Sequence, residues 1–175
     1  MGQNNLELVV LDVETSGMRP EDGHCVIELG AQRLRGTEIL ASFDYLIKPS
    51  RPLDPESQAV HGITEAELLE KGREPAEVFA EFREFSKDAV LVGHNVGFDL
   101  AFINAEYRRL GQEALTNEIL DTIALARRYL ILPSYSLKNV AAYLKVPQPS
   151  AHRALADVQT TTEVLLKLIE RAKQR

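Results

Sequence analysis

Residues 8–17 read LVVLDVETSG, in which four consecutive apolar residues precede two acidic residues, Asp12 and Glu14. An apolar run of this kind is typical of a central strand that is buried on both faces of a sheet. Because residues i and i+2 of a strand point to the same face, the two carboxylates should project together from the end of the strand. The segment therefore predicts a central strand that ends in a pair of acids.

The pair of acids has two interpretations. Two like charges held this close raise each other's pKa unless a cation lies between them. Mg²⁺ and Mn²⁺ prefer carboxylate oxygens as ligands, so Asp12 and Glu14 would suit a divalent metal site. The alternative is a solvated strand end where acidic residues happen to alternate, and the pair by itself leaves both interpretations open.

The next part of the chain predicts two strands that extend the sheet from the first one. Residues 26–35 and 38–48 are separated by a Gly-Thr turn, so they should form a hairpin and, with the first strand, an antiparallel meander. Pro49, Pro52 and Pro55 argue against regular structure in the segment after this hairpin.

The second half of the chain predicts helices and strands in alternation. Thr64 and Glu67 match a capping box that should start a short helix, the apolar run at 89–92 predicts a buried strand, and the short segment 118–120 is a candidate for the last strand. The resulting fold class is α/β: a mixed sheet of about five strands with helices on both faces, in one domain spanning residues 1–175. A helical turn is expected at 57–61, and further helices at 75–87, 97–110, 122–130, 136–144 and 153–172.

Composition limits the classes of function. The chain has 175 residues, of which 45% are hydrophobic, and its net charge of −6 argues against a broad basic face that grips duplex nucleic acid. That charge still allows a nucleic-acid substrate held through metal ions in an acidic pocket. The single cysteine, Cys25, and the polar start of the chain predict a soluble, cytoplasmic protein with no membrane segment.

Two downstream segments carry further acids where strands or loops lead into helices. Asp99 lies in the first turns of the helix after the strand at 89–92, where a helix N-terminus favours an ionised carboxylate. Asp157 lies near the start of the last helix, and His152 can approach it only from the loop that precedes that helix. Asp99 alone is also explained as a helix-start charge, and His152 alone as a surface residue.

Three segments stand in order along the chain: Asp12-Val-Glu14-Thr15, Asn95-Val-Gly-Phe98-Asp99 and His152-Arg-Ala-Leu-Ala-Asp157. Together they resemble the three exonuclease motifs of the DEDDh 3′–5′ exonuclease superfamily, over residues 6–168. His61-Gly-Ile63-Thr adds a segment seen in the branch that contains the epsilon proofreading subunit of bacterial DNA polymerase III. The related tyrosine branch has Tyr where this chain has Arg153, so the chain is similar to the histidine branch.

The resemblance implies a ribonuclease-H-like fold and a role for each motif residue. Asp12, Glu14, Asp99 and Asp157 would hold two divalent cations, Mg²⁺ or Mn²⁺, and His152 would be the general base. The two ions would activate a water and neutralise the leaving oxygen of a phosphodiester. A histidine with an ordinary pKa of about 6.5 can accept the water's proton near neutral pH.

The resulting hypothesis is a 3′–5′ exonuclease that releases nucleoside 5′-monophosphates from single-stranded or frayed DNA, with a DNA polymerase subunit as a candidate partner. One alternative is an exoribonuclease of the same superfamily that trims RNA 3′ ends, since nothing in the sequence reads the 2′-hydroxyl. Another is a non-catalytic nucleic-acid-binding scaffold, which would be expected to have lost a metal ligand. The residues expected to contact the terminal nucleotide are Thr15, Gly17, His61, Ile63, Asn95, Phe98 and Phe102.

Overall fold

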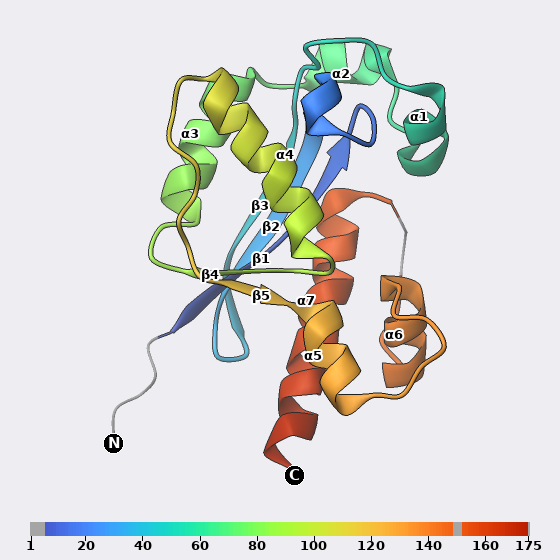
Figure 1. Ribbon diagram of the computed structural model, residues 1–175. Helices are drawn as coiled ribbons and strands as arrows, with labels where there is room; N and C mark the ends of the chain where they lie inside the picture. The colour runs from blue at the N-terminus through green and yellow to red at the C-terminus, as the bar shows by residue number, and fades with distance from the viewer. Residues whose placement is uncertain (1–5, 149–151, 175) are drawn as a thin grey trace.

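The computed structural model describes residues 6–148 and 152–174, and its elements follow the expected α/β order (Figure 1). The strands are β1 (Glu7–Thr15), β2 (Val26–Arg35), β3 (Glu38–Leu46), β4 (Val90–Gly93) and β5 (Ile119–Asp121). The helices are η1 (Pro20–Asp22), α1 (Pro55–His61), α2 (Glu65–Lys71), α3 (Pro75–Phe85), α4 (Val96–Arg109), α5 (Thr122–Tyr129), α6 (Leu137–Leu144) and α7 (Ala154–Lys173). Among the described residues, no helix is long and apolar enough to cross a membrane.

The five strands form one mixed sheet in the order β3-β2-β1-β4-β5, which confirms the predicted fold class. The strand that carries the first two acids, β1, lies at the centre of this sheet. It pairs antiparallel with β2 and parallel with β4, while β4 pairs parallel with β5. The predicted meander of β1, β2 and β3 is therefore present, and the other two strands extend the sheet from the opposite side of β1.

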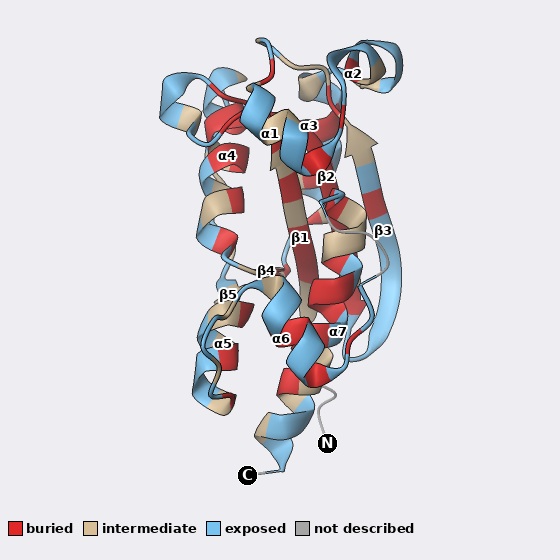
Figure 2. Cartoon of the chain, turned by 90° about the vertical axis from the view of Figure 1, so that its right-hand side faces the viewer, coloured by how far each residue is buried: buried red, intermediate tan, exposed pale blue. Residues whose placement is uncertain are grey.

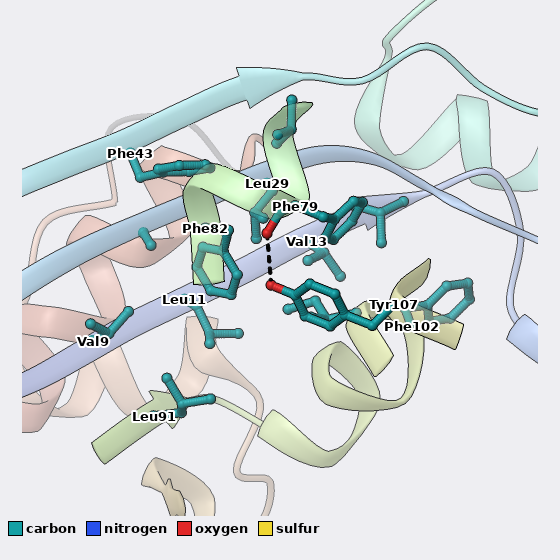
Figure 3. Close-up of a cluster of buried hydrophobic side chains, with 14 of the residues drawn as sticks. Val9, Leu11, Val13, Leu29, Phe43, Phe79, Phe82, Leu91, Phe102 and Tyr107 are labelled. Carbon is teal, nitrogen blue, oxygen red and sulfur yellow. Dashed lines mark hydrogen bonds between the residues drawn. The ribbon is translucent and has the colours of Figure 1, made fainter. Parts of the chain in front are cut away.

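Both faces of β1 are covered, as its apolar run predicts. Val9, Leu11 and Val13 pack on one face with the aromatic residues of α3 and α4, and Tyr107 donates a hydrogen bond of 3.0 Å to the carbonyl of Phe79 within this layer (Figure 3). On the opposite face, Val10 packs against the α7 side chains. Buried residues accordingly run along most of β1 between the helical layers, as Figure 2 shows.

Some predicted boundaries differ from the observed ones. The sequence predicts that Pro55 interrupts regular structure, but this residue is the first of α1. A proline is compatible with that position because the first helical N–H has no partner within the helix and the proline ring already has a helical φ. At the start of α2, the hydroxyl of Thr64 accepts a hydrogen bond of 3.1 Å from the Glu67 N–H, so that helix start is confirmed.

Close packing of α7 on the sheet depends on Gly30 of β2. A Cβ atom placed on Gly30 would lie 2.6 Å from the carbonyl carbon of Ala154 and 2.6 Å from the backbone nitrogen of Leu155. Such distances are shorter than van der Waals contact, and the neighbouring atoms belong to the backbone. The missing side chain therefore sets how closely the first turn of α7 approaches the sheet.

Gly30→Ala should lower the free energy of unfolding by about 1–3 kcal/mol, the usual cost of forcing an extra methyl group into a packed interface. Gly97→Ala is the matched control, because a Cβ atom there meets no atom within 4 Å and helix α4 gains a better helix former. Urea denaturation of the two variants measures the difference. Equal stabilities would contradict the close approach of α7 at Gly30.

Candidate active site

Three acids from two elements meet at the C-terminal end of β1. Asp12 and Glu14 project from the strand, and Asp157 comes from the first turn of α7. One carboxylate oxygen from each of the three lies within 4.8 Å of the others. The strand period places the first two on one face, and the packing of α7 against β1 and β2 brings in the third.

Asp99 lies beside this group but is held differently. It is buried in the first turn of α4, and its Oδ1 accepts a hydrogen bond of 3.0 Å from the backbone N–H of Val13. That contact fixes the start of α4 against β1 between the two strand acids. Asp99 is not one of the three residues whose oxygens share the 4.8 Å cluster, although its charge acts on Asp12.

The electrostatics of the four acids favour a bound cation. Burial, followed by repulsion from Asp99 and Glu14, holds the pKa of Asp12 well above its usual value. Burial is also the largest cause that raises the pKa of Glu14 to about 8 and that of Asp99 to about 8, and it raises the pKa of Asp157. Across residues 6–148 and 152–174, no lysine or arginine forms an ion pair with any of the four. These carboxylates repel one another when they ionise without a counter-charge. Hard divalent cations prefer carboxylate oxygens as ligands, so the four acids are suited to hold such cations.

The raised pKa values predict an unusual pH dependence for the stability of the metal-free protein. Glu14 titrates near 4.5 in the unfolded chain but near 8 in the folded one, so between these pH values the folded protein holds a proton that the unfolded chain has released. The free energy of unfolding should therefore fall as pH rises from about 5 to 9.

Thermal melts in EDTA at pH 6 and pH 9 measure this effect, because 1 kcal/mol shifts the Tm of a domain of this size by about 2–4 °C. The matched condition is the same pair of melts in excess Mg²⁺. The bound cation should neutralise the acids, so the Tm should differ less between pH 6 and pH 9. A Tm in EDTA that rises from pH 6 to pH 9 would contradict the repulsion among these carboxyls.

His152 lies one residue before the N-cap of α7, Arg153, in the loop position predicted from the sequence. It is exposed and adopts a left-handed backbone conformation with φ 63°. Its backbone N–H donates a hydrogen bond of 3.1 Å to Oδ2 of Asp157. The main chain of His152 is therefore tied to an acid of the cluster, so the residue predicted to be the base lies next to the predicted metal ligands.

A cavity of about 340 Å³ opens beside the acids. Glu14 belongs both to the acid cluster and to the wall of this cavity, so the two features are continuous. His61 also lines it, and its Nδ1 accepts a hydrogen bond of 3.0 Å from the Ile63 N–H. The other lining residues are Val13, Thr15, Met18, Asp54, Glu56, Ser57, Val60 and Phe98.

Four of the residues predicted to contact a nucleotide do not line this cavity. Ile63 and Phe102 are core residues with 1% and 0% of their surface exposed, so neither side chain faces this cavity, and their contact with a base or sugar stays a prediction. Asn95 is exposed and precedes α4, where its N–H donates to Asp121 Oδ1. Gly17 packs directly against the ring of His24, with no room for a side chain.

Sequence reasoning also missed residues that lie at or beside the site. Met18 and Val60 line the cavity with 68% and 56% of their surfaces exposed, and the sequence alone shows them only as isolated apolar residues in a loop and a short helix. Glu28 is 2% exposed and lies opposite Glu14 in the β1–β2 register. A charged residue inside the apolar run Val26–Ala31 was the available signal for it.

Comparison with known proteins agrees with this geometry. Residues 9–165 match the RNase_T family, described as exonuclease. The chain is 39% identical over 171 residues to a DNA polymerase III PolC-type protein of Latilactobacillus sakei, covering 96% of this chain and 12% of that protein. It is 36% identical over 177 residues to a DNA polymerase III subunit epsilon-like protein of Rhodobacter capsulatus, covering 98% of this chain and 25% of that protein.

Among solved structures, exonuclease X in complex with 5′ overhanging duplex DNA matches with a TM-score of 0.76 and 25% identity, over 95% of this chain and 93% of that one. The chain spans about an eighth of the length of the PolC-type relative and a quarter of the epsilon-like one. The family match nevertheless covers both strand acids, Asp99, His152 and Asp157. The chain therefore belongs to the RNase_T exonuclease family and is a DEDDh-type exonuclease that resembles the epsilon subunit of DNA polymerase III.

Proposed function

We propose that this chain is a metal-dependent 3′–5′ exonuclease that removes nucleoside 5′-monophosphates from single-stranded or frayed DNA ends. The observation that carries the proposal is the continuity between the acid cluster and the adjacent cavity through Glu14. A cavity of about 340 Å³ falls at the lower end of the usual range for small-ligand sites. A terminal nucleotide held there would present its phosphate to the acids.

The acids would hold two divalent cations, Mg²⁺ or Mn²⁺, with Asp12, Glu14 and Asp157 as the converging ligands and Asp99 completing the set. When bound, such ions polarise the phosphate and make the attacking water more acidic. His152 would accept the proton of that water, since it precedes the helix that carries Asp157. The hydrogen bond from Val13 to Asp99 keeps the fourth carboxylate oriented toward the strand acids.

The cavity walls would recognise the terminal nucleotide. Met18, Val60 and Phe98 supply apolar surface for a base or sugar, and His61 supplies a polar side chain in the same wall. One nucleotide fills such a space, so a paired end would have to fray before it could enter. This requirement favours single-stranded or mismatched ends as substrates.

Deoxyribonucleic acid is the preferred substrate in this proposal because relatives 39% and 36% identical to the chain are named as DNA polymerase III proteins. The same similarity supports association with a DNA polymerase and a role in proofreading.

We also propose that residues 1–175 act as one exonuclease domain, since a single sheet carries all five described strands. The alternative of RNA trimming predicts a preference for a ribose 3′ end, and a scaffold would lack turnover.

Digestion of matched 3′-labelled DNA and RNA oligonucleotides, with Mg²⁺ or with EDTA, tests the proposal. The labelled product should be a mononucleotide, formed from linear DNA in Mg²⁺ and not in EDTA. A circular single strand of the same composition is the control, because it offers no 3′ end to the cavity and should remain intact. Cleavage of the circle would show an endonuclease, and faster digestion of RNA than of DNA would favour the exoribonuclease.

A further inference from the structure

Glu28 is a buried charge that the exonuclease mechanism does not use. It lies in β2 with 2% of its surface exposed, and its Cα pairs with that of Glu14 across the β1–β2 ladder. Its carboxylate accepts hydrogen bonds from Arg153 Nε at 2.9 Å and from Arg153 Nη2 at 2.7 Å. It also accepts one from the Ala154 N–H at 2.9 Å. All of these donors belong to one short segment, residues 153 and 154, and together they satisfy the hydrogen-bonding capacity of the buried carboxylate.

That segment is the beginning of α7. The residue at the N-cap position, Arg153, makes no side-chain cap, so the first helical N–H is satisfied by Glu28 from a strand 126 residues earlier in the chain. The negative charge also lies at the positive end of the helix dipole. Gly30, two residues further along β2, leaves room for the helix backbone at the same point. Two features of β2 therefore fix where α7 starts.

Arg153 lies between two residues of the candidate site. His152 is its chain neighbour, and Asp157 lies one helical turn later and receives the His152 N–H bond. We propose that Glu28 and Arg153 are positioning residues that hold Asp157 and His152 in register with Asp12 and Glu14. This inference rests on the proposed function, because it assigns these two residues a role in that metal site.

A structural ion pair at the other end of the same strands offers a matched comparison. Glu7 in β1 is bound by Arg33 and Arg35 of β2, and it lies at the opposite end of β1 from Asp12 and Glu14. If Glu28 and Arg153 merely stabilise the fold, disrupting either ion pair should have the same kind of effect. If they position the site, only the pair at α7 should alter metal binding.

The decisive variant is Glu28→Met/Arg153→Met, which removes both charges together. Replacing one partner alone would leave a buried, unpaired charge near Glu14 and change the field at the acids as well as the geometry. The double replacement keeps the local net charge and similar volume, and apolar substitution of a buried ion pair commonly preserves folding. Glu7→Met/Arg33→Met is its control. Arg153→Lys keeps the charge but cannot form the two-nitrogen contact with Glu28.

Isothermal titration with Mn²⁺ alone, without nucleic acid, is the first measurement. Mn²⁺ affinity should fall by about 10–100-fold in Glu28→Met/Arg153→Met, the usual cost of losing the groups that orient metal ligands. It should fall by a smaller factor in Arg153→Lys and stay unchanged in Glu7→Met/Arg33→Met. Circular dichroism at the titration temperature verifies that each variant is folded, and Arg153→Lys decides the question if the double variant is not.

Steady-state hydrolysis of a linear oligonucleotide gives the second measurement. The kcat should fall by about 10–100-fold with KM within about twofold, because the cavity that holds the nucleotide is untouched. Unchanged Mn²⁺ affinity in both α7 variants would overturn the positioning role while leaving the exonuclease proposal intact. Equal losses in the Glu7→Met/Arg33→Met control would also overturn it, and an unmodified protein that binds no Mn²⁺ would overturn the metal site along with it.

Discussion

Asp12→Asn should reduce exonuclease activity to background while raising the Tm of the metal-free protein. Burial, together with repulsion from Asp99, Glu14 and Asp157, raises the pKa of Asp12 well above the usual range. Removing its charge deprives the site of a central ligand and at the same time relieves the repulsion in the absence of metal. Loss of activity and gain of stability from one substitution is the signature of a ligand cluster whose charges are costly in the folded state.

Mononucleotide release in Mg²⁺ and thermal melts in EDTA measure the two effects of Asp12→Asn. Asp88→Asn is the control, because Asp88 is an exposed acid just before β4, at the end of the sheet away from the cluster. That variant should retain both activity and Tm. Turnover by Asp12→Asn close to that of the unmodified protein, or full activity in excess EDTA, would exclude a reaction that depends on these carboxylates.

His152→Asn should lower kcat by ~10²–10⁴-fold, the range for loss of a general base. Asparagine is the better replacement than alanine because residue 152 has φ 63°, a left-handed conformation that asparagine tolerates. The hydrogen bond to Asp157 comes from the backbone N–H of residue 152, so it should persist in the variant. Mn²⁺ affinity and KM should therefore change little while the chemical step slows.

The pH dependence of kcat distinguishes a base from a surface residue. With His152 in place, kcat should rise with pH along an acidic limb, because a general base must be unprotonated to accept a proton. In His152→Asn this limb should weaken, and activity should partly recover at higher pH, where hydroxide needs no base. A variant with nearly unchanged kcat and the same pH profile would show that His152 merely precedes α7.

Local signals were sufficient for most of the helices and strands. The apolar run before Asp12 predicted a central strand covered on both faces, and the capping box at Thr64 predicted the start of α2. Such features depend on neighbours within a few residues, through the strand period or the chemistry of a turn. The resemblance of three short motifs then predicted which acids belong together, and the structure brings Asp12, Glu14 and Asp157 within reach of one cation.

Tertiary packing alone decided which residues face the nucleotide cavity. Phe98 and Phe102 lie one turn apart on α4 with ring centroids separated by 5.0 Å, yet Phe98 lines the cavity and Phe102 is buried in the core. Helical periodicity places both phenylalanines on the same side of α4. It does not show which of them packs in the core and which lies beyond the core, at the cavity. The same limit applies to Met18, which becomes a wall residue only when α1 packs beside its loop.

The sequence by itself determined a mixed α/β sheet, its central strand, and a set of acids and a histidine suited to metal-assisted hydrolysis. Only the tertiary structure decided that Glu28 holds the start of α7 and that Asp99 is oriented by the Val13 N–H. These contacts join residues 126 and 86 positions apart in the chain. Sequence patterns record the period of one element at a time, whereas such contacts depend on the distance and angle at which two packed elements meet.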